Sequence, residues 1–473
     1  MVVSTMKKYS ADKINWFLTE EGLKGVVEQF SHPENSKRHY QVYNYQGGKI
    51  FIKSFLERGF TGRIRHYFAP RGKTEFLIGS KLASFDILTP KVFGYGIGKN
   101  HSCVVEEYIE GQSLLDAMKK TTERRNILTG LAGLLRELQL KGVRHNDLHL
   151  DNVLIHGDRL YLIDLHKTKI KKDFNDADEV SNFTHALGII YDDILESDRN
   201  FLFAQYHCSP VMRQKIEQEI ARLKKNWIIN KKKRAFKNTS MLRASGDYVY
   251  MKGAEAGANG EFIAFLKKDK KVTVERFSDH IRKTYQKQGR LKTAWENHVV
   301  LAYLKSTAVP QAFFVKLPVL SSNGYIAMED LGHKGIELDR FLDGQYDNMG
   351  LSEKKRFTEG FVRFLQGLFR QRIAHRDMKG CNIFALHDGG FAVLDVEDFV
   401  FQEIGEEMLK RMLTQLNTTV PKRISSRDRM RFFLKLTAPL NMDKKRLFRN
   451  IVSESKNSDI VYEGVGGLRR EQW

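Results

Sequence analysis

The sequence contains few cysteines and no long apolar segment. Its three cysteines, Cys103, Cys208 and Cys381, are scattered, odd in number and without metal-ligand spacing, so we expect a reducing cytosolic compartment and no disulfide framework. No segment approaches the ~18 consecutive apolar residues that a membrane-spanning helix needs, and residues 1–13 lack the pattern of a signal peptide. Hydrophobic residues nevertheless make up 41% of the chain, which indicates a globular composition.

Acidic residues are outnumbered by basic ones. The chain has 78 Lys and Arg against 57 Asp and Glu, which gives a net charge of +21. Because a balanced solvated surface would mix the two signs, this excess predicts an acidic partner. Charge alone does not choose between nucleic acid, anionic lipid headgroups and a phosphorylated glycolipid. The basic residues gather in Lys224-Lys225, Lys231–Arg234, Lys267–Lys271, Arg427–Arg431 and Lys444–Arg446.

One motif occurs twice in the chain. It reads VRHNDLHLDNVLIHGDRLYLIDL from Val143 to Leu165 and IAHRDMKGCNIFALHDGGFAVLDV from Ile373 to Val396. In each copy an Asp is followed five positions later by an Asn, and a further Asp closes a short apolar run. This spacing is typical of the catalytic base and the two magnesium ligands of kinase-like folds. The residues are Asp147, Asn152 and Asp164 in the first copy and Asp377, Asn382 and Asp395 in the second.

The chemistry explains why these residue types recur. Phosphoryl transfer needs positioned charge around a triphosphate and its metal ion more than it needs covalent help. One carboxylate must lie at the acceptor hydroxyl, while a second carboxylate and an amide oxygen suit Mg²⁺. In the second copy Lys379 could also neutralise charge on the transferred group. We therefore predict ATP and Mg²⁺ as cofactors, with Asp147 and Asp377 as bases.

The repeat extends to strands before each motif. Tyr40–Phe55 and Phe262–Phe277 align without a gap as two hairpins with period-two alternation. In the first hairpin Lys53 lies on a strand, and Glu75 follows 22 residues later in a basic helical stretch. This arrangement predicts a lysine that contacts the ATP phosphates and is held by a carboxylate. The first copy therefore contains every residue type that a kinase-like active site needs.

The second copy departs from this pattern. Glu275 takes the position aligned with Lys53, and Glu296 follows 21 residues later as the counterpart of Glu75. An anion at Glu275 would repel phosphates unless Arg276 or Lys252 substitutes for the lysine. Gly253–Gly260 could form a glycine-rich turn over phosphates. The second site is either active with altered nucleotide contacts or used to bind the acceptor, and the first is the better equipped catalyst.

Strands that resemble kinase hinges follow each helical stretch, at Cys103–Gly111 and Gly324–Gly332. Backbone groups from Glu106 to Tyr108, and from Met328 to Asp330, are where an adenine ring is expected to hydrogen-bond. This interpretation depends on the catalytic loops, because such strand-to-loop geometry is common.

At 473 residues the chain is long enough for two or three domains. We predict an α+β protein of two tandem protein-kinase-like domains, each with a small β-rich lobe and a larger helical lobe. The first domain covers residues 1–225, a basic and poorly periodic linker covers 226–240, and the second domain covers 241–473. Oligomeric state does not follow from the sequence.

Two segments of protein kinases are missing. Neither Asp164 nor Asp395 is followed by Phe-Gly, and no Ala-Pro-Glu closes an activation segment. Asn146, rather than Arg, precedes Asp147, so no basic pocket for an activating phosphate is indicated there. These absences favour a small-molecule, sugar or lipid-linked acceptor over a protein.

Two stretches of the first half carry a family resemblance. The first is the catalytic segment, RHNDLHLDNVL with LYLIDLHKTKI, and the second lies upstream of it, TEFLIGSKLASFDILTPKVFGYG (Thr74 to Gly96). Both stretches resemble the bacterial lipopolysaccharide core kinase family. The second half is similar more loosely, through HRDMKGCNIF and Ser425–Leu436. The resemblance implies an ATP-dependent kinase for heptose or 3-deoxy-D-manno-octulosonic acid (Kdo) of the inner core. Such an enzyme would work in the cytoplasm, peripherally at the inner membrane, on a glycolipid acceptor. The basic surface suits that anionic leaflet and makes nucleic acid the less favoured partner.

Other functions remain open at this point. An atypical protein kinase or a soluble small-molecule phosphotransferase, for example for an aminoglycoside, would use the same chemistry, although a basic chain argues mildly against a cationic acceptor. A binding scaffold at the membrane with pseudokinase halves belongs to another class. Glu275 favours the scaffold for the second half, whereas Lys53, Asp147 and Asp164 argue against it for the first.

Overall fold

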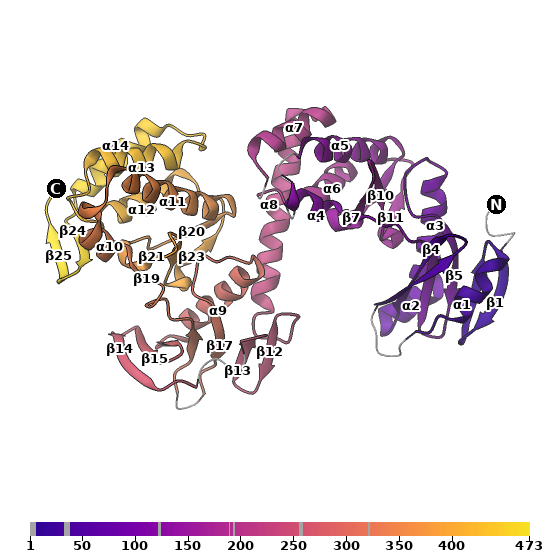
Figure 1. Ribbon diagram of the computed structural model, residues 1–473, viewed down its shortest axis with the longest axis horizontal. Helices are drawn as coiled ribbons and strands as arrows, with labels where there is room; N and C mark the ends of the chain where they lie inside the picture. The colour runs from indigo at the N-terminus through magenta and orange to yellow at the C-terminus, as the bar shows by residue number, and fades with distance from the viewer. Residues whose placement is uncertain are drawn as a thin grey trace. The chain divides into compact units, whose positions relative to one another are not determined.

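The computed structural model describes residues 6–32, 38–121, 124–188, 190–192, 194–254, 259–319 and 322–473. The chain divides into two compact units, Met1–Leu223 and Lys224–Trp473. Both units combine helices with antiparallel sheets (Figure 1). The mixed helix and sheet content expected from the sequence is therefore present.

The first unit begins with a six-stranded sheet in the order β1-β2-β5-β6-β4-β3. Along β4, Ile50 and Ile52 are buried on one face, which places Lys53 on the other face. Helix α3 packs against β5 and β6. Gly72 permits this approach, because a Cβ there would lie 2.1 Å from the carbonyl oxygen of Cys103. The elements are β1 (Lys7–Ala11), β2 (Ile14–Leu18), α1 (Lys24–Glu28), β3 (Arg38–Tyr45), β4 (Gly48–Leu56), α2 (Phe60–Phe68), α3 (Arg71–Ala83), β5 (Val92–Ile97) and β6 (His101–Glu107).

A mainly helical part completes the first unit. Leu128, Leu131, Leu135 and Leu138 recur at helical spacing along α5 and are buried in its core. Short strand pairs β8-β11 and β9-β10 carry the first catalytic motif. The elements are β7 (Gln112–Ser113), α4 (Leu114–Lys120), α5 (Arg125–Leu140), β8 (Val143–His145), β9 (Val153–His156), β10 (Arg159–Leu162), β11 (Thr168–Ile170), α6 (Asp176–Leu187), α7 (Glu196–Tyr206) and α8 (Pro210–Lys233), which continues past the boundary of this unit at Leu223.

The second unit also opens with a sheet, here of seven strands in the order β12-β13-β17-β18-β16-β15-β14. Helix α9 is anchored by Trp295, which is fully buried and donates its Nε1–H to the carbonyl of Ala235 at 2.8 Å. The elements are β12 (Leu242–Ser245), β13 (Tyr248–Met251), β14 (Phe262–Lys268), β15 (Val272–Phe277), β16 (Ile281–Tyr285), α9 (Gln288–Tyr303), β17 (Ala312–Lys316) and β18 (Tyr325–Met328).

Helices again dominate the rest of the second unit. Helices α11 and α13 pack together, as do α12 and α14 (Figure 1). The elements are β19 (Gly335–Glu337), α10 (Leu338–Gln345), α11 (Leu351–Arg370), β20 (Ile373–His375), β21 (Ile383–Leu386), β22 (Phe391–Val393), β23 (Phe399–Phe401), α12 (Glu406–Asn417), α13 (Ser426–Thr437), α14 (Lys444–Lys456), β24 (Ile460–Gly464) and β25 (Gly467–Glu471).

The segment interpreted as a linker, residues 226–240, is not irregular throughout. Helix α8 continues to Lys233 and therefore includes its first part. Met212, Ile216 and Ile220 recur every four residues and are buried, which gives this helix an apolar face. In the last turns of the helix Lys231–Lys233 leave few apolar positions, so no helical periodicity is visible there in the sequence.

Candidate active site

The first catalytic loop is held by its own side chains. His145 ends β8 and is fully buried, and its Nδ1 accepts the backbone N–H of Asp147 at 3.2 Å. Its Nε2 lies 3.2 Å from the carbonyl oxygen of Ile163. Burial lowers the pKa of His145 to about 4, so the ring is neutral and can donate to one of these groups while it accepts from the other. His145 therefore supports the loop and is not a proton carrier.

Asn152 fixes the same loop from its other end. Its Nδ2 donates to the carbonyl oxygen of Asp147 at 2.9 Å, which explains the five-residue spacing of the two. The carboxylate of Asp147 is partly exposed, and its Oδ2 lies 2.5 Å from Nζ of Lys167. Lys167 stands three residues after Asp164, in the segment that carries the family resemblance, and was given no catalytic role from the sequence. Its charge helps to keep the pKa of Asp147 below its usual value, against the effect of burial.

Lys53, Glu75 and Asp164 meet in one buried cluster, as the sequence predicts. Nζ of Lys53 lies 3.1 Å from Oε1 of Glu75 and 2.7 Å from Oδ1 of Asp164. Glu75 is fully buried, and Asp164 adopts a left-handed backbone with φ of 59° where the apolar strand ends. Burial alone would lower the pKa of Lys53, but the surrounding carboxylates raise it. The lysine is therefore a fixed cation in the cleft.

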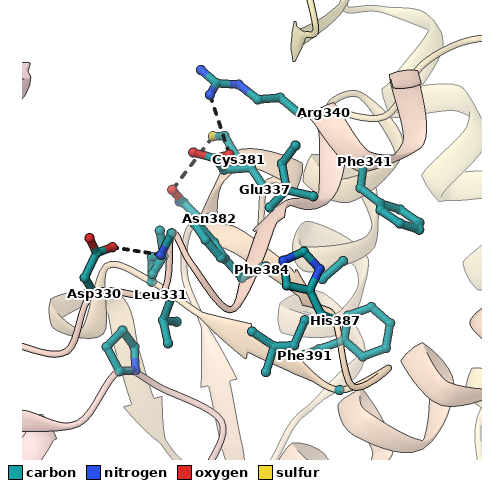
Figure 2. Close-up of a pocket in the computed structure, with 18 of the residues that line it drawn as sticks. Asp330, Leu331, Glu337, Arg340, Phe341, Cys381, Asn382, Phe384, His387 and Phe391 are labelled. Atoms are coloured by element: carbon teal, nitrogen blue, oxygen red, sulfur yellow. Dashed lines mark hydrogen bonds and ion pairs between the residues drawn. The ribbon is translucent and has the colours of Figure 1, made fainter. Parts of the chain in front are cut away.

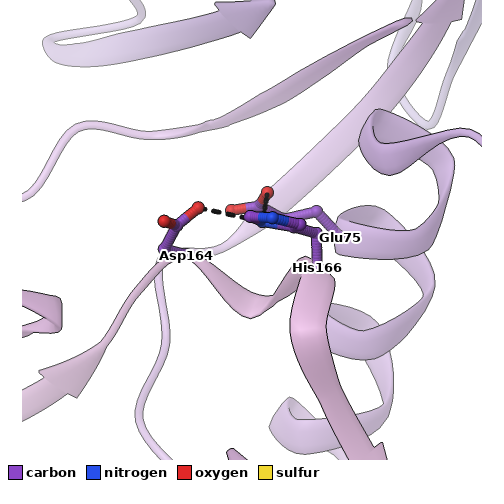
Figure 3. Close-up of side chains that lie close together, drawn as sticks. All are labelled: Glu75, Asp164 and His166. Atoms are coloured by element: carbon purple, nitrogen blue, oxygen red, sulfur yellow. Dashed lines mark ion pairs between the residues drawn. The ribbon is translucent and has the colours of Figure 1, made fainter. Parts of the chain in front are cut away.

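His166 is a member of this cluster that the sequence reasoning missed. Its Nδ1 lies 3.0 Å from Oδ1 of Asp164 and 3.7 Å from Oε2 of Glu75 (Figure 3). Burial opposes protonation, but the two carboxylates raise the pKa of His166 above its usual value. The signal in the sequence is its position two residues after Asp164. The three side chains are close enough to hold a metal ion together, although Lys53 already contacts both carboxylates.

Glu106 lies on β6, and Tyr108 directly follows that strand. Val104 is opposite Lys53 in the sheet, so Glu106, two residues further along β6, faces the same side. Glu106 is 7% exposed, and burial together with the neighbouring carboxylates raises its pKa, while Lys53 opposes the shift. The backbone N–H of Tyr108 is already donated to the carbonyl of Lys49 at 2.9 Å, and the expected adenine contact along Glu106 to Tyr108 stays a prediction.

The first site suits a magnesium ion by its donor chemistry. The amide nitrogen of Asn152 is committed to Asp147, which leaves the amide oxygen as the group able to bind a cation. The Asp164 carboxylate, whose pKa is lowered by His166 and Lys53 against the effect of burial, remains charged. An amide oxygen and a carboxylate are ligands that Mg²⁺ prefers. These two residues would hold the ion, and the ion would neutralise phosphate charge.

The second catalytic loop repeats this geometry. Nδ2 of Asn382 donates to the carbonyl oxygen of Asp377 at 2.9 Å, and the Asp377 backbone N–H is donated to Nδ1 of buried His375. Asp395 is left-handed, with φ of 51°. Lys379 forms an ion pair with Asp377 at 2.8 Å, a position comparable to that of Lys167 beside Asp147.

The strand alignment drawn from the sequence is wrong by one strand in the second unit. The strand that pairs with the hinge-like strand β18 is β16, not β15, and it carries Lys283, whose Nζ lies 2.5 Å from Oδ1 of Asp395. Glu275 on β15 is opposite Arg282, the neighbour of Lys283, and so faces the other side of the sheet. Glu296 lies 3.9 Å from Lys292 and is not brought to Lys283. The alternation of apolar and polar residues is the same on β15 and β16, so it could not show which of the two strands carries the lysine.

The other substitutes considered for the lysine are engaged elsewhere. Nε of Arg276 lies 2.8 Å from Asp330, and Nζ of Lys252 donates to the carbonyl of Thr239 at 2.8 Å. The glycine-rich stretch Gly253–Gly260 follows β13, and its residues 255–258 lie outside the described part of the chain.

A cavity of about 1950 Å³ opens in the second unit beside Lys283 and Asp395. It extends from the β14-β15 hairpin past β18 to α10 and α11. Figure 2 shows part of its lining, in which Asn382 and Cys381 lie beside Glu337 and Arg340. Burial raises the pKa of Cys381 to about 12, so this cysteine carries no thiolate chemistry at neutral pH.

The site of the first unit brings together a lysine held by a helix carboxylate, a loop Asp and Asn, and an Asp at the end of an apolar run, which is the pattern of kinase-like phosphotransferases. Residues 37–199 match the model of the Lipopolysaccharide kinase (Kdo/WaaP) family. This segment, less than half of the chain, contains every predicted site residue of the first unit. The resemblance to the lipopolysaccharide core kinase family is thus confirmed over it, and the chain is a phosphotransferase with an alcohol group as acceptor.

Other comparisons add little. A solved structure described as "WaaP in complex with acyl carrier protein" is 20% identical to this chain, with a TM-score of 0.32. The match covers 44% of this chain and 90% of that one. No curated protein matches the chain.

Proposed function

We propose that the protein transfers the γ-phosphoryl group of ATP, with Mg²⁺, to a hydroxyl of heptose or Kdo in the lipopolysaccharide inner core. The single observation that carries this proposal is the complete Lys53, Glu75 and Asp164 cluster inside the segment that matches the family. The second unit is proposed as a second kinase-like domain, because it repeats the catalytic loop and the left-handed Asp.

The proposed roles follow from the geometry of the first site. Lys53 binds the α and β phosphates, and Glu75 holds its ammonium group. Asp147 orients the acceptor hydroxyl and accepts its proton, while Lys167 beside it holds that carboxylate ionised. Asn152 and Asp164 hold the metal ion, which supplies charge neutralisation at the transferring group.

An acceptor panel tests this function. Purified protein with labelled Mg-ATP is given dephosphorylated core lipopolysaccharide, a protein extract or an aminoglycoside in separate reactions. We expect label on the glycolipid alone. Label only on protein would favour an atypical protein kinase, and label only on the soluble sugar would favour a small-molecule phosphotransferase.

We further propose that the protein contacts the cytoplasmic leaflet of the inner membrane through helix α2. One face of this helix carries Phe60, Ile64, Tyr67 and Phe68 at helical spacing. The three aromatic side chains are each at least 79% exposed. Aromatic side chains with flanking arginines suit the interface of an anionic bilayer. None of the described helices is long and apolar enough to cross a membrane.

The position of α2 fits this role. A hollow lined by Arg65, Arg71, His166 and Lys167 lies between α2 and the catalytic segment, and Lys167 contacts Asp147. A bilayer against α2 would therefore lie close to the acceptor side of the first site, where a membrane-embedded glycolipid must reach.

Vesicle binding tests the contact. A variant with Phe60, Tyr67 and Phe68 replaced by Ser should lose binding to vesicles that contain anionic lipid, while wild-type binding should weaken steeply with salt. The matched control replaces Leu140, Leu195 and Val211, which are exposed elsewhere in the first unit. Equal vesicle binding by the two variants would contradict the membrane contact. A wild-type protein that captured only a soluble acidic protein, and no vesicles, would contradict it as well.

A further inference from the structure

Strand β16 of the second unit has the place in its sheet that β4 has in the first. Strand β4 lies between β3 and β6, and β16 lies between β15 and β18. Lys53 is opposite Val104 of the hinge-like strand, and Lys283 is opposite Ile326 of its counterpart. Lys283 therefore occupies the register of a nucleotide-binding lysine, although the matched family segment ends at residue 199.

The carboxylates around Lys283 come from a different element than in the first unit. Its Nζ lies 2.5 Å from Asp395 and 3.0 Å from Oε1 of Glu397, which is 2% exposed. Nε of Arg290 on α9 lies 3.1 Å from the same Glu397 oxygen. The helix itself presents His298 to this cavity, and burial with the nearby Lys283 lowers the pKa of His298 to about 3.

The carboxylate and the imidazole thus occupy opposite positions in the two units. In the first, the acid is Glu75 on the helix and the imidazole is His166, two residues after the metal-binding Asp. In the second, the imidazole is His298 on the helix and the acid is Glu397, two residues after Asp395. Each cleft therefore combines an Asp and a lysine with at least one further carboxylate and one histidine.

A basic hairpin lines part of the second cleft. Lys267 and Lys268 end β14, Lys270 and Lys271 lie in the turn before β15, and Lys267 lines the cavity together with Lys283 and Arg276. Several cations around the Asp395 carboxylate and the amide of Asn382 provide complementary charge for a polyphosphate with its metal ion.

We propose that this cleft is a second, independent site for a magnesium–nucleoside triphosphate complex, with Lys283, positioned by Glu397 and Asp395, as its phosphate-binding lysine. The inference rests on the proposed kinase-like nature of the second unit, but not on the activity of the first. A cavity of about 1950 Å³ exceeds the ~300 to 1,000 Å³ of common small-molecule pockets. Its α10 and α11 wall, with Arg340, Arg356 and Arg363, leaves room for an anionic group beyond the nucleotide.

Binding stoichiometry tests the proposal without relying on turnover. Calorimetry with the magnesium complex of a non-hydrolysable ATP analogue should give two sites per full-length chain. Lys53→Ala should leave one site, Lys283→Ala should leave the other, and the double variant should leave none. Glu397→Gln should weaken the second site about tenfold without removing it, because Asp395 still holds the lysine.

The matched controls are Glu275→Ala and Glu296→Gln. Both residues belong to elements next to Lys283, but neither is brought to it, so both variants should keep two sites. Thermal unfolding of each variant establishes that it is folded before its stoichiometry is interpreted.

The outcomes separate this inference from the proposed function. One site that is lost in Lys53→Ala and unchanged in Lys283→Ala would overturn the inference and leave the first site intact. Two sites with no phosphate transfer to the glycolipid would support the inference while the proposed function failed. Loss of the second site in Glu275→Ala would show that the strand assignment behind the proposal is wrong.

Discussion

Replacing Lys53 by Ala should destabilise the first unit as well as disable it. The substitution removes the cation that lies 2.7 Å from Asp164 and 3.1 Å from Glu75, and both carboxylates are buried. Removing one partner of a buried ion pair costs about 3 to 5 kcal/mol. Because His166 remains beside both carboxylates, we expect the lower end of this range.

Calorimetric unfolding of the full chain measures the effect. For a unit of this size, a loss of about 3 kcal/mol lowers the melting temperature by ~6 to 12 °C. Lys49→Ala is the matched control, since Lys49 lies on the same strand but forms an exposed ion pair with Glu110. That substitution should cost at most about 1 kcal/mol.

The dependence on pH sharpens the test. Without Lys53 the remaining carboxylates, including Glu106 with its raised pKa, repel one another when ionised. Protonation at acidic pH relieves this repulsion, so the stability difference from wild type should shrink as pH falls from about 8 to about 5. A difference below about 1 kcal/mol at the higher pH, or one that grows on acidification, would refute the charge-balance reasoning.

Other variants test local features of the first unit. Burial lowers the pKa of His101 from 6.5 to about 4, so stability should be fully present above pH 6.5 and decrease as pH falls towards 4, which urea titrations would detect and His101→Phe should flatten. Gly72→Ala should cost about 1 to 3 kcal/mol in urea unfolding, because its Cβ would meet the Cys103 carbonyl at 2.1 Å. Gly133→Ala, with open space around it, should instead stabilise helix α5 by about 0.5 to 1 kcal/mol. Asn152→Ala should reduce phosphate transfer at least about 100-fold while the chain stays folded, as circular dichroism would check.

The catalytic loops could be predicted from the sequence because their chemistry is local. Asp147 and Asn152 are joined by one side-chain hydrogen bond across five residues, and Asp164 closes the short apolar run that contains strand β10. Lys53 on β4 and Glu75 on α3 are also only 22 residues apart, with the short helix α2 between them. Residues that lie this close together in the sequence can be related to one another without knowledge of the fold.

The nucleotide-site lysine of the second unit could not be identified from the sequence, because its identification depends on the order of strands in the sheet. Lys283 is recognised only once β16 is known to pair with β18, because alternation is the same on every strand of a meander. The pattern could have suggested His166 and Glu397, which both stand two residues after an assigned Asp. The helical part of α8 was hidden by lysines, whose long side chains leave few apolar positions for a periodicity to show.

The most direct test of the account is single-turnover transfer of labelled γ-phosphate to dephosphorylated core lipopolysaccharide in vesicles. Wild-type protein is compared with Asp147→Asn and with Asp377→Asn, its matched counterpart in the second unit. Label on the glycolipid should disappear with Asp147→Asn and persist to a measurable share with Asp377→Asn. Transfer that survives Asp147→Asn but is lost with Asp377→Asn would contradict the assignment of the first unit as the main catalytic site.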